Sequence, residues 1–444
     1  MSEVEIKQER GWKRYPAYKD SGVEWLGEIP EGWKMIRLKY AAPVSSVKLT
    51  QKPDHLPYLG LEHIESKTGR LLLDTPVENV ESTVSCFEKG DVLFGKLRPY
   101  LAKVFLTEFQ GVSTTELLAL KTSQEVNGKF LFYQLIAEGF INQVNSFTYG
   151  TKMPRVSPEQ ITSLFITLPP LTEQQAIARF LDRETVKIDT LIAKKERLIE
   201  LLKEKRTALI SHAVTKGLNP DAPMKDSGIE WLGKIPEGWD ILALKRIGSF
   251  HGGTGFPESE QGLKDEELPF YKVSDTNLPD NIVFMRSCTN SISRITSRKL
   301  GARIFPKGAI IFAKVGAALL LNKRRILSCD SCIDNNMMAF LIYTCDVIWA
   351  YYWMSSLDLG NLANPGAVPS INESQISSIY APVPPLTEQQ AIAQFLDRET
   401  AKIDTLVTKT RISIDKLKEY RTSLISAAVT GKIDIRENLT PSSN

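Results

Sequence analysis

The sequence predicts an α+β chain built as an internal repeat, in which two similar mixed α/β domains are separated by two long antiparallel helices. Two pairs of nearly identical segments support this prediction. Residues 20–33 and 226–239 agree at 12 of 14 positions, and residues 169–191 and 384–406 agree at 21 of 23. The inserts between them, 34–168 and 240–383, differ in length and share little identity. The pattern indicates a constant framework with pseudo-twofold symmetry that holds two variable inserts.

The repeat divides the 444 residues into seven segments. They are an N-terminal framework segment (1–33), a first domain (34–170), a central long helix (171–217), a repeated framework segment (218–239), a second domain (240–385), a C-terminal long helix (386–432) and a flexible tail (433–444). Recent duplication without specialisation would explain the matching segments. It would not explain why only the inserts have diverged.

Segments 172–216 and 387–430 are predicted to be helices of roughly 65 Å each, at about 1.5 Å per residue. Neither contains Pro or Gly before Gly217 or Gly431, which are the expected helix ends. Each begins with a threonine, Thr172 or Thr387, followed three residues later by Gln, which predicts a capping box.

Apolar residues recur at sevens in both helices, with Leu181 and Ile188 in the first matched by Leu396 and Ile403 in the second. Further apolar residues are expected to widen the first row, namely Leu191, Ile192, Leu198 and Ile199. A long helix with one apolar stripe needs a long partner. We therefore expect the two helices to form an antiparallel coiled coil, rather than to lie separately on domain surfaces.

The inserts are predicted to share one mixed α/β fold. The expected strands are Asp91–Phe94, Val104–Leu106 and Glu116–Leu120 in the first insert, and Phe270–Val273, Ala309–Phe312 and Met338–Ile342 in the second. Helices are expected at Phe130–Phe140 and Val347–Ser356. Faint echoes align Lys96 with Lys314, Pro154 with Pro369, and Gln160 with Gln375.

Composition excludes several classes of protein. The first residues are polar, and the longest apolar run, around Ala309–Leu321, is interrupted by Lys314, so we expect neither a secretory signal nor a membrane span. The five cysteines contain a single C-x-x-C, Cys329 and Cys332, with no second pair for zinc. We therefore expect a cytoplasmic chain with reduced thiols and no metal.

No catalytic signature stands out. The sequence has no Walker loop and no Rossmann glycine fingerprint. The nearest string to the Asn-Pro-Pro-aromatic motif of amino-methyltransferases, Leu168-Pro169-Pro170-Leu171, lacks the polar residue that would hold the target amine. We therefore expect a chain that is not itself an enzyme and binds no cofactor.

Local charge points to a polyanion, although the net charge is only +3. No acidic residue occurs from Asn281 to Cys329, a run that contains Arg286, Arg294, Arg298, Lys299, Arg303, Lys307, Lys314, Lys323, Arg324 and Arg325. The first insert contributes Lys96, Arg98, Tyr100 and Lys103, and a loop with Lys152 and Arg155. Any single Lys or Arg could belong to a solvated basic face, but the occurrence of cations in both inserts favours contact with a polyanion such as double-stranded DNA.

These motifs together resemble those of the specificity subunit of type I restriction–modification systems, over residues 16–432. The resemblance rests on Lys19–Trp33 and Lys225–Trp239, on the two Leu-Pro-Pro-Leu-Thr-Glu-Gln-Gln segments, on Lys89–Tyr100, and on the Gly-x-x-x-Pro-Arg loop that ends at Arg155. The second insert departs from the pattern, because Ser370 stands at the counterpart of Arg155 and Val315-Gly316 at that of Leu97-Arg98.

The resemblance implies two target-recognition domains, each reading one half of a split DNA site. It also implies that the helices and framework bind two modification subunits, which use S-adenosylmethionine to methylate adenine N6, and that restriction subunits join them. Three alternatives remain: a two-domain DNA-binding regulator without enzymatic partners, a self-contained methyltransferase or nuclease, and a repeat scaffold. Co-purification of a modification subunit would separate the first alternative from the specificity subunit.

Overall fold

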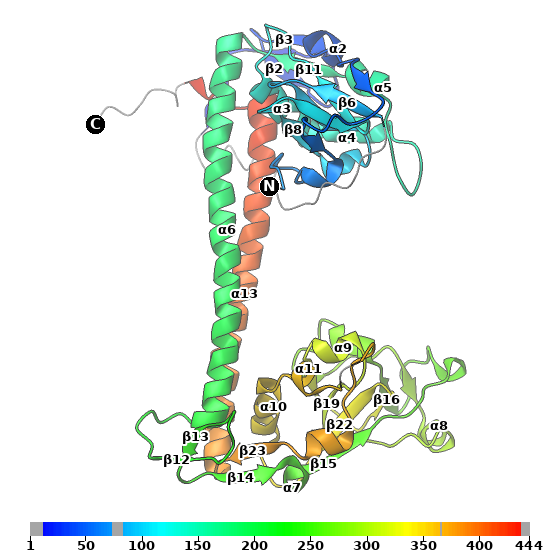
Figure 1. Cartoon of the computed structure of the whole chain (residues 1–444), viewed down its shortest axis with the longest axis vertical. Helices are drawn as coiled ribbons and strands as arrows, with labels where there is room; N and C mark the ends of the chain where they lie inside the picture. Colours follow the sequence, from blue (N-terminus) through cyan, green and yellow to red (C-terminus); the bar gives the residue numbers. More distant parts are fainter. Residues whose placement is uncertain (1–11, 73–82, 365, 437–444) are drawn as a thin grey trace. The chain divides into compact units, whose positions relative to one another are not determined.

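A computed structural model of the chain describes residues 12–72, 83–364 and 366–436 (Figure 1). The chain divides into two compact units, unit 1 (residues 1–197 and 410–444) and unit 2 (198–409). The boundary falls inside both long helices, α6 (Leu171–Lys216) and α13 (Leu386–Val429). Residues 1–11 of the expected N-terminal framework and 437–444 of the expected tail lie outside the described residues.

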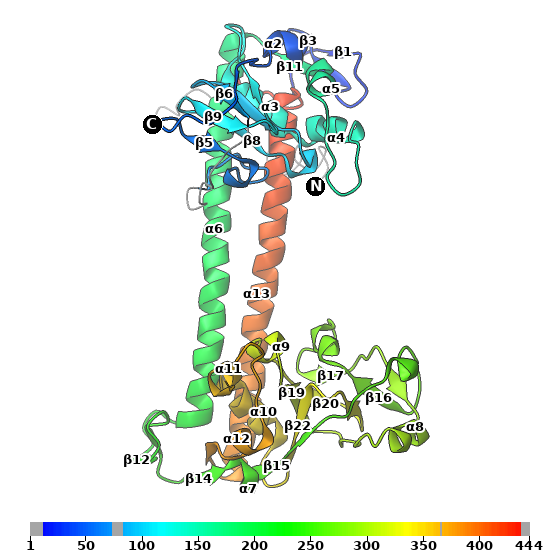
Figure 2. The ribbon, with the colours of Figure 1, turned by 45° about the vertical axis from the view of Figure 1, so that its right-hand side comes forward.

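Unit 1 contains a domain of two small sheets covered by short helices (Figure 2). The four-stranded sheet has the order β4 (Lys48–Leu49), β6 (Val84–Phe87), β9 (Gly111–Thr114), β5 (Tyr58–Leu59), and the three-stranded sheet the order β10 (Leu117–Leu120), β7 (Val92–Gly95), β8 (Val104–Leu106). The other elements are β1 (Tyr18–Asp20), β2 (Glu28–Pro30), β3 (Lys34–Arg37), α2 (Leu38–Ala41), η1 (Leu61–His63), η2 (Pro99–Leu101), α3 (Gly128–Ile136), α4 (Glu138–Ser146), α5 (Pro158–Ser163) and β11 (Phe165–Leu168). Because β11 pairs antiparallel with β3, the insert leaves the framework beside the point where it entered.

Unit 2 repeats this plan. Its five-stranded sheet has the order β15 (Gly248–Gly252), β22 (Met337–Ile342), β19 (Ile310–Ala313), β20 (Arg324–Leu327), β17 (Phe284–Met285), and its three-stranded sheet the order β18 (Ser291–Ile292), β16 (Leu268–Tyr271), β21 (Cys332–Ile333). The other elements are β12 (Met224–Asp226), β13 (Lys234–Pro236), β14 (Asp240–Ala243), α7 (Leu244–Ile247), η3 (Glu258–Glu260), η4 (Val273–Asn277), α8 (Arg294–Lys299), α9 (Ala317–Leu320), α10 (Val347–Ser356), α11 (Leu359–Leu362), α12 (Glu373–Ser377) and β23 (Tyr380–Val383). Here β14 pairs with β23, as β3 does with β11 in unit 1.

The six expected strands are all present, with ends shifted by no more than a few residues. The helix expected at Phe130–Phe140 is instead two helices, α3 and α4, because Ala137 is extended, with a ψ of 138°. Beyond this break the ring of Trp25 lies where a Cβ on Gly139 would be, 2.5 Å from its Cε3. The framework segment thus packs against the start of α4.

The long helices run antiparallel within each unit. In unit 1, Asp189 Oδ1 of α6 lies 3.0 Å from Arg421 Nε of α13, and Glu196 Oε1 lies 4.0 Å from Lys418 Nζ. In unit 2, the equivalent pair joins Arg206 Nε to Asp404 Oδ1 at 3.1 Å. Residues later in α6 therefore contact residues earlier in α13, so the two helices are antiparallel, as the apolar stripes predict.

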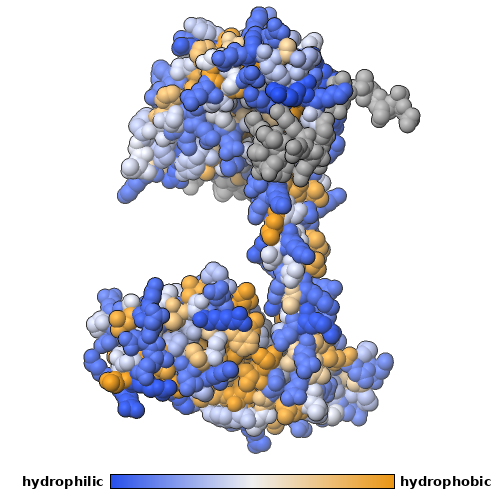
Figure 3. All heavy atoms as spheres, turned by 180° about the vertical axis from the view of Figure 1, so that it is seen from behind, coloured by the Kyte–Doolittle hydropathy of each residue, from blue (hydrophilic) through white to orange (hydrophobic). Residues whose placement is uncertain are grey.

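Two details of the helix prediction are wrong. Leu191 and Leu198 are exposed, and only Ile192 and Ile199 of the widened row are buried; Figure 3 shows hydrophobic side chains scattered among hydrophilic ones on the helices. The threonines are not N-caps, because α6 and α13 begin one residue earlier. The carbonyl of Pro170 accepts from the amides of Glu173 and Gln174, so Thr172 already lies in the first turn.

The repeated framework segments are hairpins that pack against helix ends. In unit 1, β1 and β2 meet the end of α13, where Lys432 Nζ donates to the carbonyls of Leu26 at 2.9 Å and Glu28 at 2.8 Å. In unit 2, Lys216 Nζ at the end of α6 donates to the carbonyls of Leu232 and Lys234.

A glycine ends each helix, as expected, because the buried tryptophan of the hairpin approaches closely. Gly431 has a φ of +72° beside Trp33, and Gly217 a φ of +78° beside Trp239. Only glycine adopts this backbone conformation without strain while leaving room for the ring.

Candidate nucleic-acid interface

Three segments of unit 1 meet at a junction that contains several of the predicted site residues. The amide of Lys96 donates to the carbonyl of Glu116 at 2.9 Å, and the amide of Val156 donates back to Lys96 at 3.2 Å. The amide of Arg98 donates to the carbonyl of Pro154 at 2.8 Å. The junction therefore places the segments around Lys96, Glu116 and Arg155 side by side, although they are far apart in sequence.

The loop that feeds this junction lies between α4 and α5 and extends away from the domain (Figures 1 and 2). It is closed by Tyr149 and Arg155, whose amides and carbonyls exchange two hydrogen bonds of 3.0 Å. Gly150 turns the chain with a φ of +86°. Tyr149, Lys152 and Met153 are exposed, so the loop presents a cation and two large apolar groups to solvent.

Electrostatic coupling connects the cations at the junction. Arg155 Nη2 lies 3.2 Å from Glu116 Oε1. Partial burial lowers the pKa of the Lys96 ammonium, and Lys48 and Arg155 lower it further against the opposing effect of Glu116. An added anion such as a phosphate would be attracted to this set of positive charges.

The remaining predicted residues of unit 1 differ in exposure. Arg98 is exposed and has a left-handed backbone, with a φ of 50°, and Tyr100 is exposed beside it. Lys103 points back into the domain, because its Nζ donates to the carbonyl of Leu61 at 2.6 Å. Partial burial also lowers the pKa of Lys103. Of these residues, Lys103 is the least suited to contact a ligand.

Unit 2 contains the same junction with different side chains. The amide of Lys314 donates to the carbonyl of Asn336 at 2.8 Å, and the amide of Ile371 donates back to Lys314 at 2.9 Å. The amide of Gly316 donates to the carbonyl of Pro369 at 2.8 Å, and Asn364 pairs with Ser370. The alignments of Lys96 with Lys314 and of Pro154 with Pro369 are thus confirmed, and Ser370 does stand at the place of Arg155.

The acid-free run of unit 2 does not form one exposed basic patch. Arg324 is only 2% exposed, and its guanidinium donates to the carbonyls of Asn322 at 2.7 Å and Leu357 at 2.6 Å. Burial lowers its pKa to about 10. A side chain enclosed by carbonyls of its own domain cannot reach DNA, so its selection as a contact residue is wrong.

Neighbouring cations of the run also have partners inside the domain. Arg325 donates from Nη2 to the carbonyl of Thr276 at 3.0 Å, and from Nη1 to that of Arg324 at 2.7 Å. Lys323 Nζ donates to the side-chain carbonyl of Asn277. The contacts with Thr276 and Asn277 could not be read from the run, because both partners lie outside it.

The cations of α8 remain on the surface. Arg294, Arg298 and Lys299 are all exposed on this short helix. Two of them are balanced by acids from before the run, since Arg294 Nε lies 3.8 Å from Glu267 Oε1 and Lys299 Nζ lies 3.1 Å from Glu260 Oε1. Such exposed pairs are weak and exchange readily with other partners.

Sequence reasoning missed one polar group at the edge strand β15. Ser249 Oγ lies 2.8 Å from His251 Nε2 and 2.5 Å from the hydroxyl of the exposed Tyr343. Burial, together with Arg303, lowers the pKa of His251. Alternation along the strand places Ser249 and His251 on one side, but single polar residues in a short strand give no signal that marks them as a surface.

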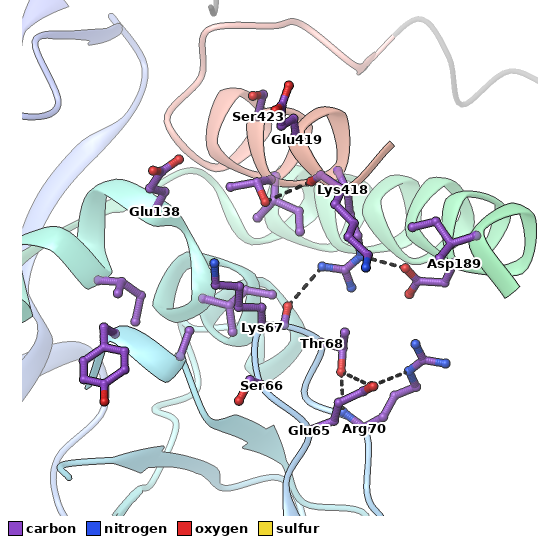
Figure 4. Close-up of a pocket in the computed structure, with 18 of the residues that line it drawn as sticks. Glu65, Ser66, Lys67, Thr68, Arg70, Glu138, Asp189, Lys418, Glu419 and Ser423 are labelled. Carbon is purple, nitrogen blue, oxygen red and sulfur yellow. Dashed lines mark hydrogen bonds and ion pairs between the residues drawn. The ribbon is translucent and has the colours of Figure 1, made fainter. Parts of the chain in front are cut away.

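Unit 1 also contains a cavity of about 910 Å³ between the domain and its helices (Figure 4). Its wall includes Arg421, whose Nη1 donates to the carbonyl of Lys67 at 3.1 Å while Nε pairs with Asp189. The lining mixes cations such as Lys67 and Lys418 with acids such as Glu138 and Glu196. This balance of charge does not select a charged ligand.

Within the described ranges, no group of three His, Cys, Asp or Glu side chains is arranged to hold a metal ion. All five cysteines are free thiols; Cys332 is buried in β21, which raises its pKa to about 11, whereas Cys329 is exposed. None of the helices that the structure describes is long and apolar enough to cross a membrane.

Comparison with known proteins identifies relatives over the whole repeat. The type I restriction modification DNA specificity domain matches residues 30–201 and 236–416. The chain is 23% identical over 437 residues to the type I restriction enzyme MjaVIII specificity subunit of Methanocaldococcus jannaschii, covering 92% of this chain and 94% of the relative. It is 28% identical over 185 residues to the EcoDI specificity subunit of Escherichia coli, covering 40% of this chain and 41% of the relative.

Solved structures show the same fold. A chain from a structural study of complex assembly in the type I R-M system matches with a TM-score of 0.67 at 18% identity, covering 90% of this chain and 98% of that one. The HsdS subunit from Thermoanaerobacter tengcongensis matches with a TM-score of 0.53 at 18% identity, covering 91% of this chain and 98% of that one. With both domains matched by the family, the chain belongs to the type I restriction–modification DNA specificity family.

Proposed function

We propose that the chain is the DNA-reading subunit of a type I restriction–modification complex, and that each domain reads one half of a bipartite site. One observation supports this most directly: the two junctions share their backbone hydrogen bonds but differ in most side chains. A scaffold alone would not need two differing surfaces on one fold. Two readers of different sequences would, because base edges are distinguished by side-chain donors and acceptors.

The chemistry belongs to partners in this proposal. Two modification subunits bind the helices and framework and use S-adenosylmethionine to methylate adenine N6, and restriction subunits join to cut unmodified DNA. The target adenine must leave the base stack to react, and the partner supplies the pocket that receives it. This chain binds no cofactor and contributes position, by fixing where along the DNA the partner acts.

The test is to express the chain with its modification subunit and to map methylated adenines in the host DNA. A bipartite site is expected, and replacing residues 34–168 with the insert of another family member should change one half only. A change in both halves would contradict the assignment of one domain to each half-site.

Purified chain alone, incubated with labelled S-adenosylmethionine and DNA, should transfer no methyl group. Transfer without a partner would show that the chain is itself a methyltransferase. Tight site-specific binding by the chain alone, with no modification subunit co-purifying, would instead favour a DNA-binding regulator.

A further inference from the structure

The two junctions provide an internal comparison that separates backbone from side chain. At each one the crossing segments exchange equivalent hydrogen bonds, from Arg98 to Pro154 at 2.8 Å in unit 1 and from Gly316 to Pro369 at 2.8 Å in unit 2. A residue of one junction can therefore be matched to a residue of the other by its hydrogen bonds. Where matched residues such as Glu116 and Asn336 differ, their backbone hydrogen bonds are equivalent and their side chains are not.

Some positions are the same in both units. The lysine whose amide begins the junction is Lys96 in one and Lys314 in the other, and both are partly buried. An ammonium is a point charge without a planar fork, so it suits a phosphate better than a particular base. A contact that both domains need, whatever base sequence they read, is a contact with the phosphate backbone of the DNA.

Other positions change chemistry completely. Glu116 of unit 1 is matched by Asn336 of unit 2, because each carbonyl accepts from the junction lysine, and Arg155 is matched by Ser370. A carboxylate and a guanidinium in unit 1 are thus replaced by an amide and a hydroxyl. Both members of the pair differ between the units, which indicates that the two side chains act together.

In unit 1 the pair of Glu116 and Arg155 holds the arginine side chain in place. The backbone of Arg155 is fixed by its two 3.0 Å hydrogen bonds with Tyr149, and its side chain by the 3.2 Å contact with Glu116 Oε1. The Arg155 side chain is 47% exposed and that of Glu116 25% exposed, so the arginine is the more accessible member of the pair. A guanidinium has five N–H donors, so one ion pair leaves enough for a second planar partner.

We propose that Arg155, held by Glu116, reads a guanine in the half-site bound by unit 1, and that unit 2 reads a different base at the matching position. Guanine presents O6 and N7 in the major groove, the pair of acceptors that a guanidinium fork fits. The inference rests on the proposed function, and it adds which residue specifies which base. In unit 2 the side-chain amide of Asn336, which is exposed at the position matched to Glu116, has the donor and acceptor that fit adenine.

The test uses the complex with modification subunits and sequencing of methylated DNA, with the half-site of unit 1 identified by exchange of residues 34–168. That half-site should contain a G·C pair at which Arg155→Lys, which keeps the charge but loses the fork, relaxes the requirement. Methylation of the wild-type site should fall roughly 10- to 100-fold, with little loss at sites carrying another base there. Glu116→Gln should relax the same position more weakly.

Lys152→Gln is the matched control, because Lys152 is exposed in the same loop. It should weaken binding to all sequences and lower the salt slope by about one, without relaxing any base. If Arg155→Lys leaves every base requirement intact, or if the half-site contains no G·C pair, the proposal is overturned while the function stands. If the wild-type complex methylates no bipartite site, the proposed function itself has failed.

A gain-of-specificity variant guards against trivial loss of folding. Asn336→Glu combined with Ser370→Arg transfers the pair to unit 2, whose junction has equivalent backbone hydrogen bonds. The second half-site should then acquire a guanine at one position, while the first stays unchanged. A stable variant that methylates the original second half-site would count against the proposal.

Discussion

Replacing Gly431 by alanine tests how closely the framework hairpin packs against the end of α13. Gly431 has a φ of +72°, and a Cβ there would lie 2.3 Å from Pro30 Cδ and 3.2 Å from Trp33 Cη2. Gly22 has nearly the same φ, +71°, but no atom within 4 Å of its Cβ position. Gly22→Ala therefore measures the strained left-handed backbone alone, about 1 kcal/mol. Gly431→Ala adds the displacement of the Pro30 ring, which by analogy with overpacked cores costs about 1–3 kcal/mol more.

The assay is thermal unfolding of the two variants beside the wild type. A compact unit of about 200 residues loses roughly 2–4 °C per kcal/mol, so Gly22→Ala should lower the melting temperature by about that amount. Gly431→Ala should lower it two to four times as far. Gly217→Ala should fall between them, because its Cβ would lie 3.1 Å from Glu388 Oε1 and 3.3 Å from Trp239 Cζ2, which are less severe contacts than those at Gly431. Equal shifts for Gly431→Ala and Gly22→Ala would refute the reasoning.

Two further predictions concern the buried arginine and the helices. Arg324→Ala should destabilise unit 2 by about 2–4 kcal/mol in urea unfolding, because it leaves the carbonyls of Asn322 and Leu357 without their donor. The variant should leave the salt dependence of DNA binding by the folded protein unchanged. A reduced slope of binding affinity against salt concentration would indicate that Arg324 does contact DNA. Inserting four residues after both Arg197 and Lys409 lengthens each helix by about 6 Å, so sequencing of methylated DNA should show a gap between half-sites that is one or two base pairs longer, at about 3.4 Å per pair. A change in the bases read, with the gap unchanged, would contradict the expectation that the helices set the spacing.

The long helices could be predicted almost to the residue, because an apolar period sustained over forty residues is a strong signal. Their starts were predicted one residue late, since the Thr-x-x-Gln pattern matches a capping box in sequence only. The first turn already begins one residue earlier, where the carbonyl of Pro170 accepts from the amides of Glu173 at 2.9 Å and Gln174 at 3.0 Å. The two-residue strands, such as β4 and β17, are too short to show any period.

Charge was the weakest guide to the site. The run from Asn281 to Cys329 has no acid in sequence, but its cations meet Glu260, Glu267 and several backbone carbonyls in space. Local composition counts only neighbours along the chain, whereas the field at a surface depends on every nearby group. In unit 1 the shorter cationic segments were a better guide to which cations lie close together, because Lys96 and Arg155 converge at one junction.

The weak sequence similarity between the inserts located the segments that form the junction, but it did not show which side chains give the junction its specificity. Lys96 with Lys314 and Pro154 with Pro369 are detectable in sequence because they are the positions that both domains keep. The match of Glu116 with Asn336 follows only from the carbonyl that each offers to its lysine. In a duplicated reader of two different sequences, side chains that specify bases must differ between the copies. Of the two pairs proposed to decide what is read, sequence comparison between the copies therefore aligns Arg155 with Ser370, which follow the shared prolines, but does not align Glu116 with Asn336.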